Sequence, residues 1–174
     1  MTLQGLLSIK SEKHFRATCD DYLSLIGNGT SRSVYQLDSK QVIKVARNVW
    51  GYAQNASKCN TFKTYEGLGL FNEITRSADN YLWVIQPLAT PISNNDARFN
   101  EIVKLVKSVE QSKYYATDDE FMQKFYKFLI DTKWKFLRDF SKRDSWGFVI
   151  NELRILDYGM NNEAYKEYFG GLNK

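Results

Sequence analysis

Residues 22–46 read YLSLIGNGTSRSVYQLDSKQVIKVA and indicate the fold class most directly. The apolar run Tyr22–Ile26 predicts a strand that stops at Gly27-Asn28-Gly29. Ser33–Leu37 and Gln41–Ala46 predict two more strands, joined by a tight turn at residues 38–40. Three strands at hairpin spacing predict an antiparallel meander.

The segments on either side of this meander extend it. Upstream, Ser11–Cys19 is predicted to form a helix after a partly apolar arm, Met1–Ile9. Downstream, residues 51–65 have weak helical character, and two further strands are predicted at Leu70–Thr75 and Tyr81–Gln86. We therefore expect a five-stranded antiparallel sheet with one helix packed on it.

Beyond Pro91 the spacing of apolar residues becomes helical. A helix is predicted around Phe99–Val109, and a longer one from Asp118 to Phe136. The longer helix carries an apolar stripe that we expect to be core rather than a ligand site, formed by Phe121, Phe125, Phe128 and Leu129.

The last segment predicts a small hairpin, Phe148–Ile150 with Leu153–Leu156, and a short helix at Glu163–Phe169. Strands that precede helices in this order predict an α+β fold with segregated halves in a single domain. Its expected parts are an N-terminal arm at 1–20, a small sheet lobe at 21–88 and a truncated helical lobe at 89–174.

Composition narrows the classes of function. The chain has 174 residues, 43% of them hydrophobic and 15% aromatic, which is typical of a folded domain. No apolar stretch approaches the ~20 residues of a membrane helix, and no signal peptide is evident, so we expect a cytoplasmic protein without a membrane partner. One histidine and two distant cysteines exclude a zinc site and a histidine-based triad. The chemistry must therefore rely on Asp, Lys and backbone amides.

Three features could carry that chemistry. The glycine-containing loop at residues 26–34 lies between two predicted strands, as a phosphate-binding loop does, although such a sequence also forms plain hairpin turns. Lys44 interrupts an apolar strand and either lies at a sheet edge or points toward a phosphate. Asp157 ends a strand and either holds a metal or caps a turn.

Taken together and in this order, these features resemble a protein kinase over residues 21–169. The loop Gly27-Asn28-Gly29-Thr30-Ser31-Arg32-Ser33-Val34 resembles G-x-G-x-x-G-x-V, Val42-Ile43-Lys44 resembles V-A-I-K, and Asp157-Tyr158-Gly159 resembles D-F-G. The likeness is greatest to small kinase-like proteins of bacteriophages, which tend to carry a G-x-G-T-S-R-x-V-Y loop and an I-L-D-Y-G ending. The resemblance implies ATP-binding residues, namely Gly27, Gly29, Thr30, Ser31, Lys44, Gln86 and Leu88.

The resemblance also implies the catalytic and metal-binding residues. Leu137–Asp144 would be the catalytic loop, in which Asp139 matches the base and Asp144 replaces the metal-binding asparagine. An alternative register places Ser145 at the asparagine position, which would weaken metal binding further. Asp157 and Asp144 would then hold Mg²⁺, and Lys44 and Asp139 would be catalytic.

The departures from the family pattern are as informative as the matches. Arg32 replaces the third glycine, and the helix that supplies a glutamate to the strand lysine offers only Glu66, late in the helix. The chain ends 15 residues after Gly159, so we expect no activation segment or peptide-binding lobe. Because of these departures, the sequence is compatible with binding of ATP and Mg²⁺ and equally with the loss of that binding.

Three functions follow, and the sequence slightly favours the first. The first is a degenerate, phage-type pseudokinase, a regulatory module that binds a protein partner. The second is a minimal ATP- and Mg²⁺-dependent phosphotransferase. The third, a nucleic-acid-binding domain, rests only on the +4 charge and the aromatic residues, and no clustered basic stripe supports it. A phage origin would place the protein in the host cytoplasm or in the virion.

Overall fold

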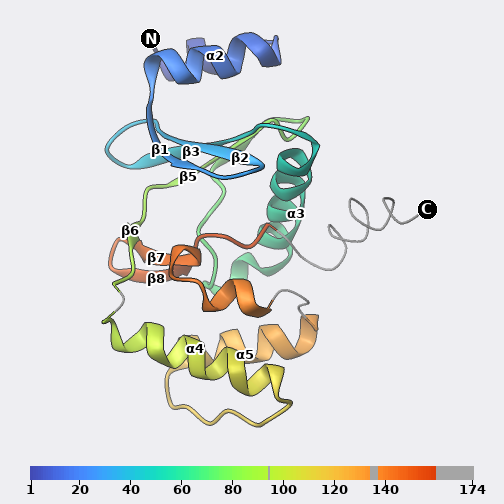
Figure 1. Cartoon of the computed structure of the whole chain (residues 1–174), viewed down its shortest axis with the longest axis vertical. Helices are drawn as coiled ribbons and strands as arrows, with labels where there is room; N and C mark the ends of the chain where they lie inside the picture. The colour runs from blue at the N-terminus through green and yellow to red at the C-terminus, as the bar shows by residue number, and fades with distance from the viewer. Residues whose placement is uncertain (94, 134–136, 160–174) are drawn as a thin grey trace, which may run out of the picture.

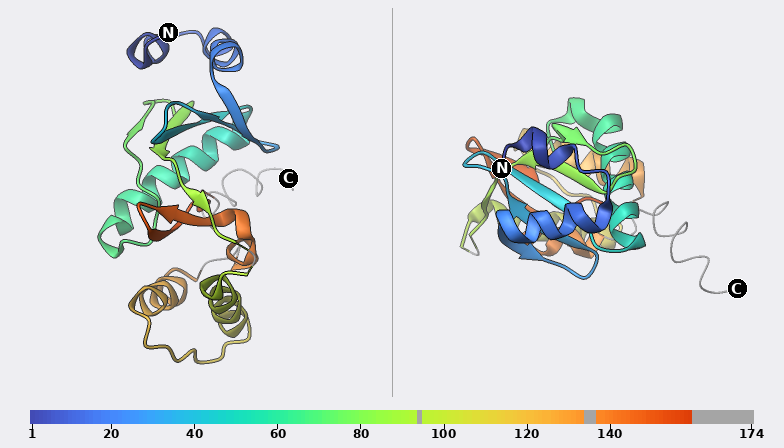
Figure 2. Two further views of the ribbon diagram at one scale, coloured as in Figure 1. Left: turned by 90° about the vertical axis from the view of Figure 1, so that its left-hand side faces the viewer. Right: turned by 90° about the horizontal axis from the view of Figure 1, so that it is seen from above.

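The computed structural model describes residues 1–93, 95–133 and 137–159, and the elements are stacked along its long axis (Figure 1). Two N-terminal helices, α1 (Leu3–Leu7) and α2 (Glu12–Tyr22), lie on the outer side of the sheet. A small hairpin lies below the sheet and two helices form the far end, an order that the side view repeats (Figure 2). The fold is α+β, as predicted.

The main sheet has five antiparallel strands in the order β1-β2-β3-β5-β4. Its central strand is β3, which has the predicted bounds and pairs in register with β2 on one side and β5 on the other. The glycine-containing loop joins β1 to β2, so it emerges at one end of the sheet. The strands are β1 (Ser24–Asn28), β2 (Arg32–Gln36), β3 (Gln41–Ala46), β4 (Arg76–Ser77) and β5 (Trp83–Pro87).

The fourth predicted strand, Leu70–Thr75, is the main difference from the sequence-based expectation. Only Arg76–Ser77 pairs with β5, and the preceding residues run outside the sheet. Leu70 and Phe71 are buried in the lower core, where Phe71 forms an isolated bridge with Ile155. The apolar pattern in this segment therefore reports burial against the hairpin rather than membership of the sheet.

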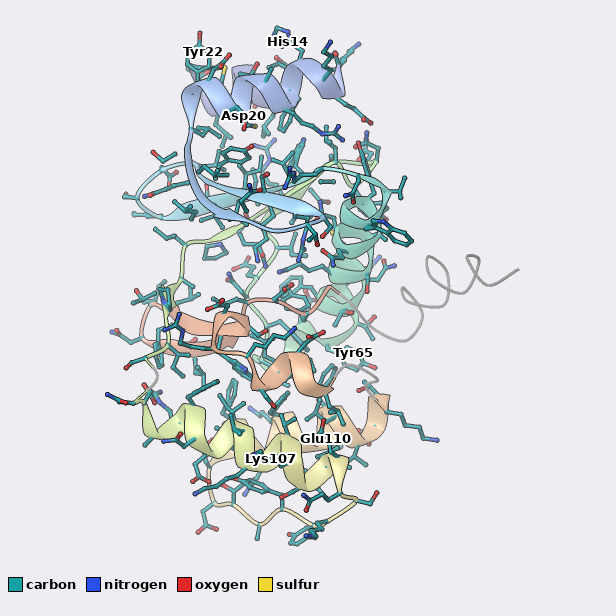
Figure 3. The ribbon with its side chains drawn as sticks, in the orientation of Figure 1. His14, Asp20, Tyr22, Tyr65, Lys107 and Glu110 are labelled. Atoms are coloured by element: carbon teal, nitrogen blue, oxygen red, sulfur yellow. The ribbon has the colours of Figure 1, made fainter. Side chains whose placement is uncertain are left out.

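Helix α2 is fixed to the sheet by packing and by polar contacts. The Phe15 ring stacks on Trp83 with centroids 6.4 Å apart. Asp20, on the sheet side of the helix (Figure 3), accepts a 2.6 Å hydrogen bond from the Tyr35 hydroxyl. Because both contacts come from one face of α2, the helix covers the outer face of the sheet and leaves the inner side to the cleft described below.

Helix α3 (Val49–Tyr65) runs from the sheet toward the hairpin and begins at Asn48, whose side chain caps its first turn. A Cβ at Gly51 would lie 2.2 Å from the Ser31 carbonyl oxygen, so only glycine allows this approach. The first turn of α3 is therefore pressed against the β1–β2 loop.

The lower part is helical and contains the second core. Helices α4 (Ala97–Glu110) and α5 (Glu120–Thr132) pack with the 3-10 turns η2 (Leu137–Ser141) and η3 (Arg143–Ser145). The predicted stripe of α5 is confirmed, because Phe125, Phe128 and Leu129 are buried and Phe121 packs against them.

The hairpin β7 (Trp146–Val149) and β8 (Glu152–Ile155) pairs with the short β6 (Thr90–Pro91). Its turn is formed by Ile150 and Asn151, both with positive φ, one residue earlier than predicted. The predicted helix at Glu163–Phe169 lies outside the described residues. Within the described part of the chain, no helix is both long and apolar enough to cross a membrane.

Candidate functional site

A cleft of about 650 Å³ lies between the sheet and the hairpin. Its walls come from the β1–β2 loop, strand β3, the segment after β5, the start of β7 and the residues that follow β8. The residues that line it are Ile26, Gly27, Asn28, Gly29, Thr30, Ser31, Arg32, Val34, Val42, Lys44, Gln54, Asn72, Pro87, Leu88, Ala89, Pro91, Asp144, Trp146, Leu156 and Asp157.

Helix α3 holds the β1–β2 loop in place. The Ser31 hydroxyl lies 2.7 Å from Gln54 Oε1, and the Asn48 side chain donates a 3.0 Å hydrogen bond to the Thr30 carbonyl oxygen. A simple hairpin turn would need no such anchors. The loop is therefore a fixed wall of the cleft.

Arg32, at the position of the missing third glycine, forms an ion pair with Asp157. The Arg32 side chain is 9% exposed, and its Nη2 lies 2.8 Å from Asp157 Oδ1. The Asp157 side chain remains 54% exposed, so a ligand in the cleft can reach it. Partial loss of solvent raises the pKa of Asp157, but the positive charges of Arg32, Lys44 and Lys58 outweigh it and hold that pKa well below its usual range.

Two lysines meet beside this ion pair. Lys44 Nζ donates to the Leu156 carbonyl oxygen at 3.0 Å, and Lys58 Nζ donates to the same oxygen at 2.5 Å. Lys58 is fully buried, and its Nζ also lies 4.4 Å from the centre of the Tyr158 ring. Burial and the neighbouring positive charges lower the pKa of both lysines, and that of Lys58 most.

Lys58 is buried because residues 157–159 lie against α3. A Cβ at Gly159 would lie 2.7 Å from the Gln54 carbonyl oxygen, so only glycine allows this contact. Tyr158 donates a 2.5 Å hydrogen bond to the Asn72 carbonyl oxygen, and its ring covers Lys58. A lysine of α3 thus lies beside Lys44, where the kinase resemblance implies a glutamate.

Sequence reasoning missed Lys58 as a site residue. A signal was available, because Gly51, Asn55 and Lys58 follow one another at four- and three-residue steps and so share one face of α3. All three are buried. The carboxylate expected late in this helix, Glu66, instead begins the 3-10 turn η1 (Glu66–Leu68).

The structure brings most of the predicted site residues together. Gly27, Gly29, Thr30, Ser31, Lys44, Leu88, Asp144 and Asp157 all line the cleft.

Gln86 and Asp139 differ, because neither is among the residues that line the cleft. Gln86 is fully buried and donates a 2.9 Å hydrogen bond to the Asn72 carbonyl oxygen. Asp139 forms an ion pair with Lys142 at 2.5 Å. A local basic partner thus holds the carboxylate that was expected to be the catalytic base.

The acidic residues of the cleft do not fit a divalent cation. Asp144 has an 89% exposed side chain and lies 3.4 Å from Arg143, whereas Asp157 is paired with Arg32. Across the described ranges, no group of three or more His, Cys, Asp or Glu side chains could hold a metal ion. A divalent ion at Asp157 would also meet the positive charges of Lys44 and Lys58, which repel it.

Fold and cleft together define an α+β protein in which the β1–β2 loop, Lys44 of β3 and Asp157, two residues beyond β8, meet in one cleft. No protein-family model matches the chain, and no curated protein matches it. Among solved structures, the chain is similar to APH(2'')-IIa in its ternary complex with streptomycin and ATP, with 11% identity, 87% of this chain and 71% of that chain covered, and a TM-score of 0.43.

Two structures of SAICAR synthase are also similar over a smaller region. The enzyme from Saccharomyces cerevisiae, complexed with SAICAR, is 13% identical over 40% of this chain, with a TM-score of 0.32. A second SAICAR synthase is 13% identical over 40% of this chain, with a TM-score of 0.33. The chain spans 34% and 35% of these two proteins. Similarity at this level carries no argument about function, which must come from the cleft itself.

Proposed function

We propose that the chain is a nucleotide-binding module with a kinase-like fold, which binds a phosphorylated ligand and does not transfer its phosphate. One observation carries the proposal: Asp157, the acid expected to hold Mg²⁺, is paired with Arg32 inside the cleft. The second acid expected to take part in transfer, Asp139, is paired with Lys142.

The walls of the cleft support a nucleotide as the ligand. A volume of about 650 Å³ is in the range of sites for small molecules and cofactors. Arg32 and Lys44 line it together with the β1–β2 loop, while Lys58, which is not among the lining residues, donates to the carbonyl oxygen of the lining residue Leu156. Basic side chains and loop amides are the groups that bind phosphate oxygens in proteins.

The same groups argue against phosphoryl transfer. That reaction depends on metal ions that neutralise charge on the phosphates and on a carboxylate that accepts the proton of the attacking hydroxyl. In this protein the cleft acid is paired with Arg32, and the expected base, Asp139, is not among the residues that line the cleft. Loss of such elements lowers rates by orders of magnitude, so binding without turnover is the expected outcome.

The test pairs a binding assay with a turnover assay. We expect calorimetric titration to detect ATP binding and a phosphate-release assay to detect no turnover above buffer. Lys44→Met should weaken ATP binding by about tenfold or more, whereas Lys40→Met, on the exposed turn before β3, should leave it unchanged. Absence of ATP binding to the folded protein, or turnover that Asp139→Asn abolishes, would contradict the proposal.

A protein that binds a nucleotide without transferring its phosphate can act by contacting another protein. We therefore include a protein partner in the proposal. The expected partner, the phage origin and a location in the host cytoplasm or virion stay predictions.

A further inference from the structure

We propose that Lys44 and Lys58 together take the place of the divalent cation, so that the cleft binds the phosphate groups of its ligand without metal. This inference rests on the proposed nucleotide-binding function and names how the same site recognises its ligand. Lys44 is the contact residue, and Lys58 is a positioning residue that acts through Lys44 and the Leu156 carbonyl group.

Arg32, Lys44 and Lys58 carry more basic groups than Asp157 can neutralise. Within the described part of the chain, no carboxylate forms an ion pair with Lys44 or Lys58, and Asp157 is already paired with Arg32. Three basic groups thus surround one acid, and positive charge remains at the floor of the cleft. Buried charge without a counterion is unfavourable, and a phosphate oxygen supplies that counterion.

Lys58 is held in a fixed position. Its ammonium group is held between the Leu156 carbonyl oxygen at 2.5 Å and the Tyr158 ring at 4.4 Å, with no exposed surface. Because Lys44 donates to the same carbonyl oxygen at 3.0 Å, the two amino groups are held close together. A glutamate in place of Lys58 would pair with Lys44 and cancel its charge, whereas a lysine leaves the charge of Lys44 available to a ligand.

The basic groups of the cleft also replace the charge that a metal ion would supply to the phosphates. In kinase-like sites the metal bridges phosphate oxygens and neutralises their charge. Here the basic groups perform that neutralisation, and the same groups repel a divalent cation from Asp157. Phosphate binding and metal binding therefore compete for one place in the cleft, and the geometry favours the phosphate.

The decisive measurement uses the unmodified protein. ATP and tripolyphosphate are titrated calorimetrically in EDTA and then in excess Mg²⁺. We expect the Kd for ATP in EDTA to lie within about threefold of its value with Mg²⁺, and tripolyphosphate to displace ATP in EDTA. ATP binding that appears only with Mg²⁺ would overturn this inference and leave the proposed function intact. No ATP binding under either condition would overturn both.

Matched variants test the role of Lys58. Lys58→Met should weaken ATP binding in EDTA by about tenfold, while Lys63→Met, exposed on the same helix, should not change it. Lys58→Glu should lose most binding in EDTA and regain part of it with Mg²⁺, because the new carboxylate pairs with Lys44 and favours a cation. Circular dichroism identifies variants that fold, and a folded Lys58→Met variant with unchanged Kd in EDTA would overturn the assigned role.

Discussion

Replacing Lys58 with Met should stabilise the ligand-free protein. The Lys58 side chain is fully buried, and that burial, followed by the positive charges of Lys44 and Arg32, lowers its pKa. Methionine has a similar length, tolerates irregular packing and makes favourable contacts with aromatic rings. The substitution therefore removes a buried charge without opening a large cavity beneath Tyr158.

The magnitude follows from the contacts that are lost and the repulsion that is relieved. The variant loses a charge-assisted hydrogen bond, worth ~1.5–3 kcal/mol, and a cation–π contact, worth ~0.5–2 kcal/mol. It is relieved of the desolvation of one ion and of the repulsion by Lys44 and Arg32, and it loses the attraction of Asp157. One pair of unit charges interacts by ~4 kcal/mol at ~4 Å and an effective dielectric constant near 20, so the excess of one repulsive pair is of that order. The Leu156 carbonyl oxygen keeps its bond to Lys44, so no acceptor is left unpaired.

The net expectation is a gain of about 1–3 kcal/mol in the free energy of unfolding, which corresponds to a rise of ~3–10 °C in Tm. Urea titration followed by circular dichroism measures it, with the exposed Lys63→Met as the control that should change stability by less than ~0.5 kcal/mol. A folded Lys58→Met protein that is less stable than the parent by more than ~1 kcal/mol would show that Lys58 serves the structure and would refute the reasoning.

Three further expectations follow from the structure. Phe125→Ala removes a fully buried ring and should lower the free energy of unfolding by ~3–5 kcal/mol in urea titration; an unchanged midpoint would contradict its place in the core. Lys44 and Lys58 lie near Arg32 and Asp157, and their pKa values in the folded protein are below 10.5. At pH values between those lowered pKa values and 10.5, these two lysines bind more protons in the unfolded chain than in the folded chain. The Tm of the ligand-free parent should therefore rise relative to that of Lys58→Met as the pH is raised toward 10.5, and tripolyphosphate should reduce that relative rise. The comparison cancels the opposite contribution of groups shared by both proteins, such as Cys19, whose pKa burial raises to about 12; a relative fall in the Tm of the parent would contradict the lowered pKa values. Finally, ATP and GTP should bind with Kd values within about threefold of each other. The backbone N–H of Leu88, which lines the cleft after β5, already donates to the Lys40 carbonyl oxygen at 2.7 Å and so is not free to recognise a base. A strong preference for one base in competition titrations would contradict this expectation.

The sequence predicted the elements in which local pattern and tertiary burial agree. Strand β3 and the stripe of α5 are examples, because alternation or helical spacing there coincides with the face that the fold buries. Leu70–Thr75 is the counterexample, since its apolar residues pack against Ile155, about 80 positions away, rather than extending the sheet. A local pattern reports that a segment is buried, but it does not report what buries it.

The difference between a local sequence pattern and its surroundings in the fold also explains which residues of the cleft were predicted and which were missed. Gly27, Lys44 and Asp157 were predicted to bind ATP and Mg²⁺ because their order along the chain matched a family pattern, and all three line one cleft. Lys58 escaped notice because a helical lysine is ordinarily exposed. Its burial depends on Tyr158, 100 positions further along the chain, so the shared helix face with Gly51 and Asn55 was a local signal that did not identify what covers Lys58.

The close packing of residues 157–159 has a consequence for how quickly a ligand is captured. Tyr158 is held by its hydrogen bond to Asn72 and by its ring contact with Phe71 at 4.7 Å, and Gly159 leaves no free space against α3. These contacts are present in the ligand-free structure, so we expect the part of the cleft wall formed by Leu156 and Asp157 to be in place before a ligand arrives. Association should then occur in one step, with an observed rate constant that grows linearly with ligand concentration and shows no plateau from a slow rearrangement.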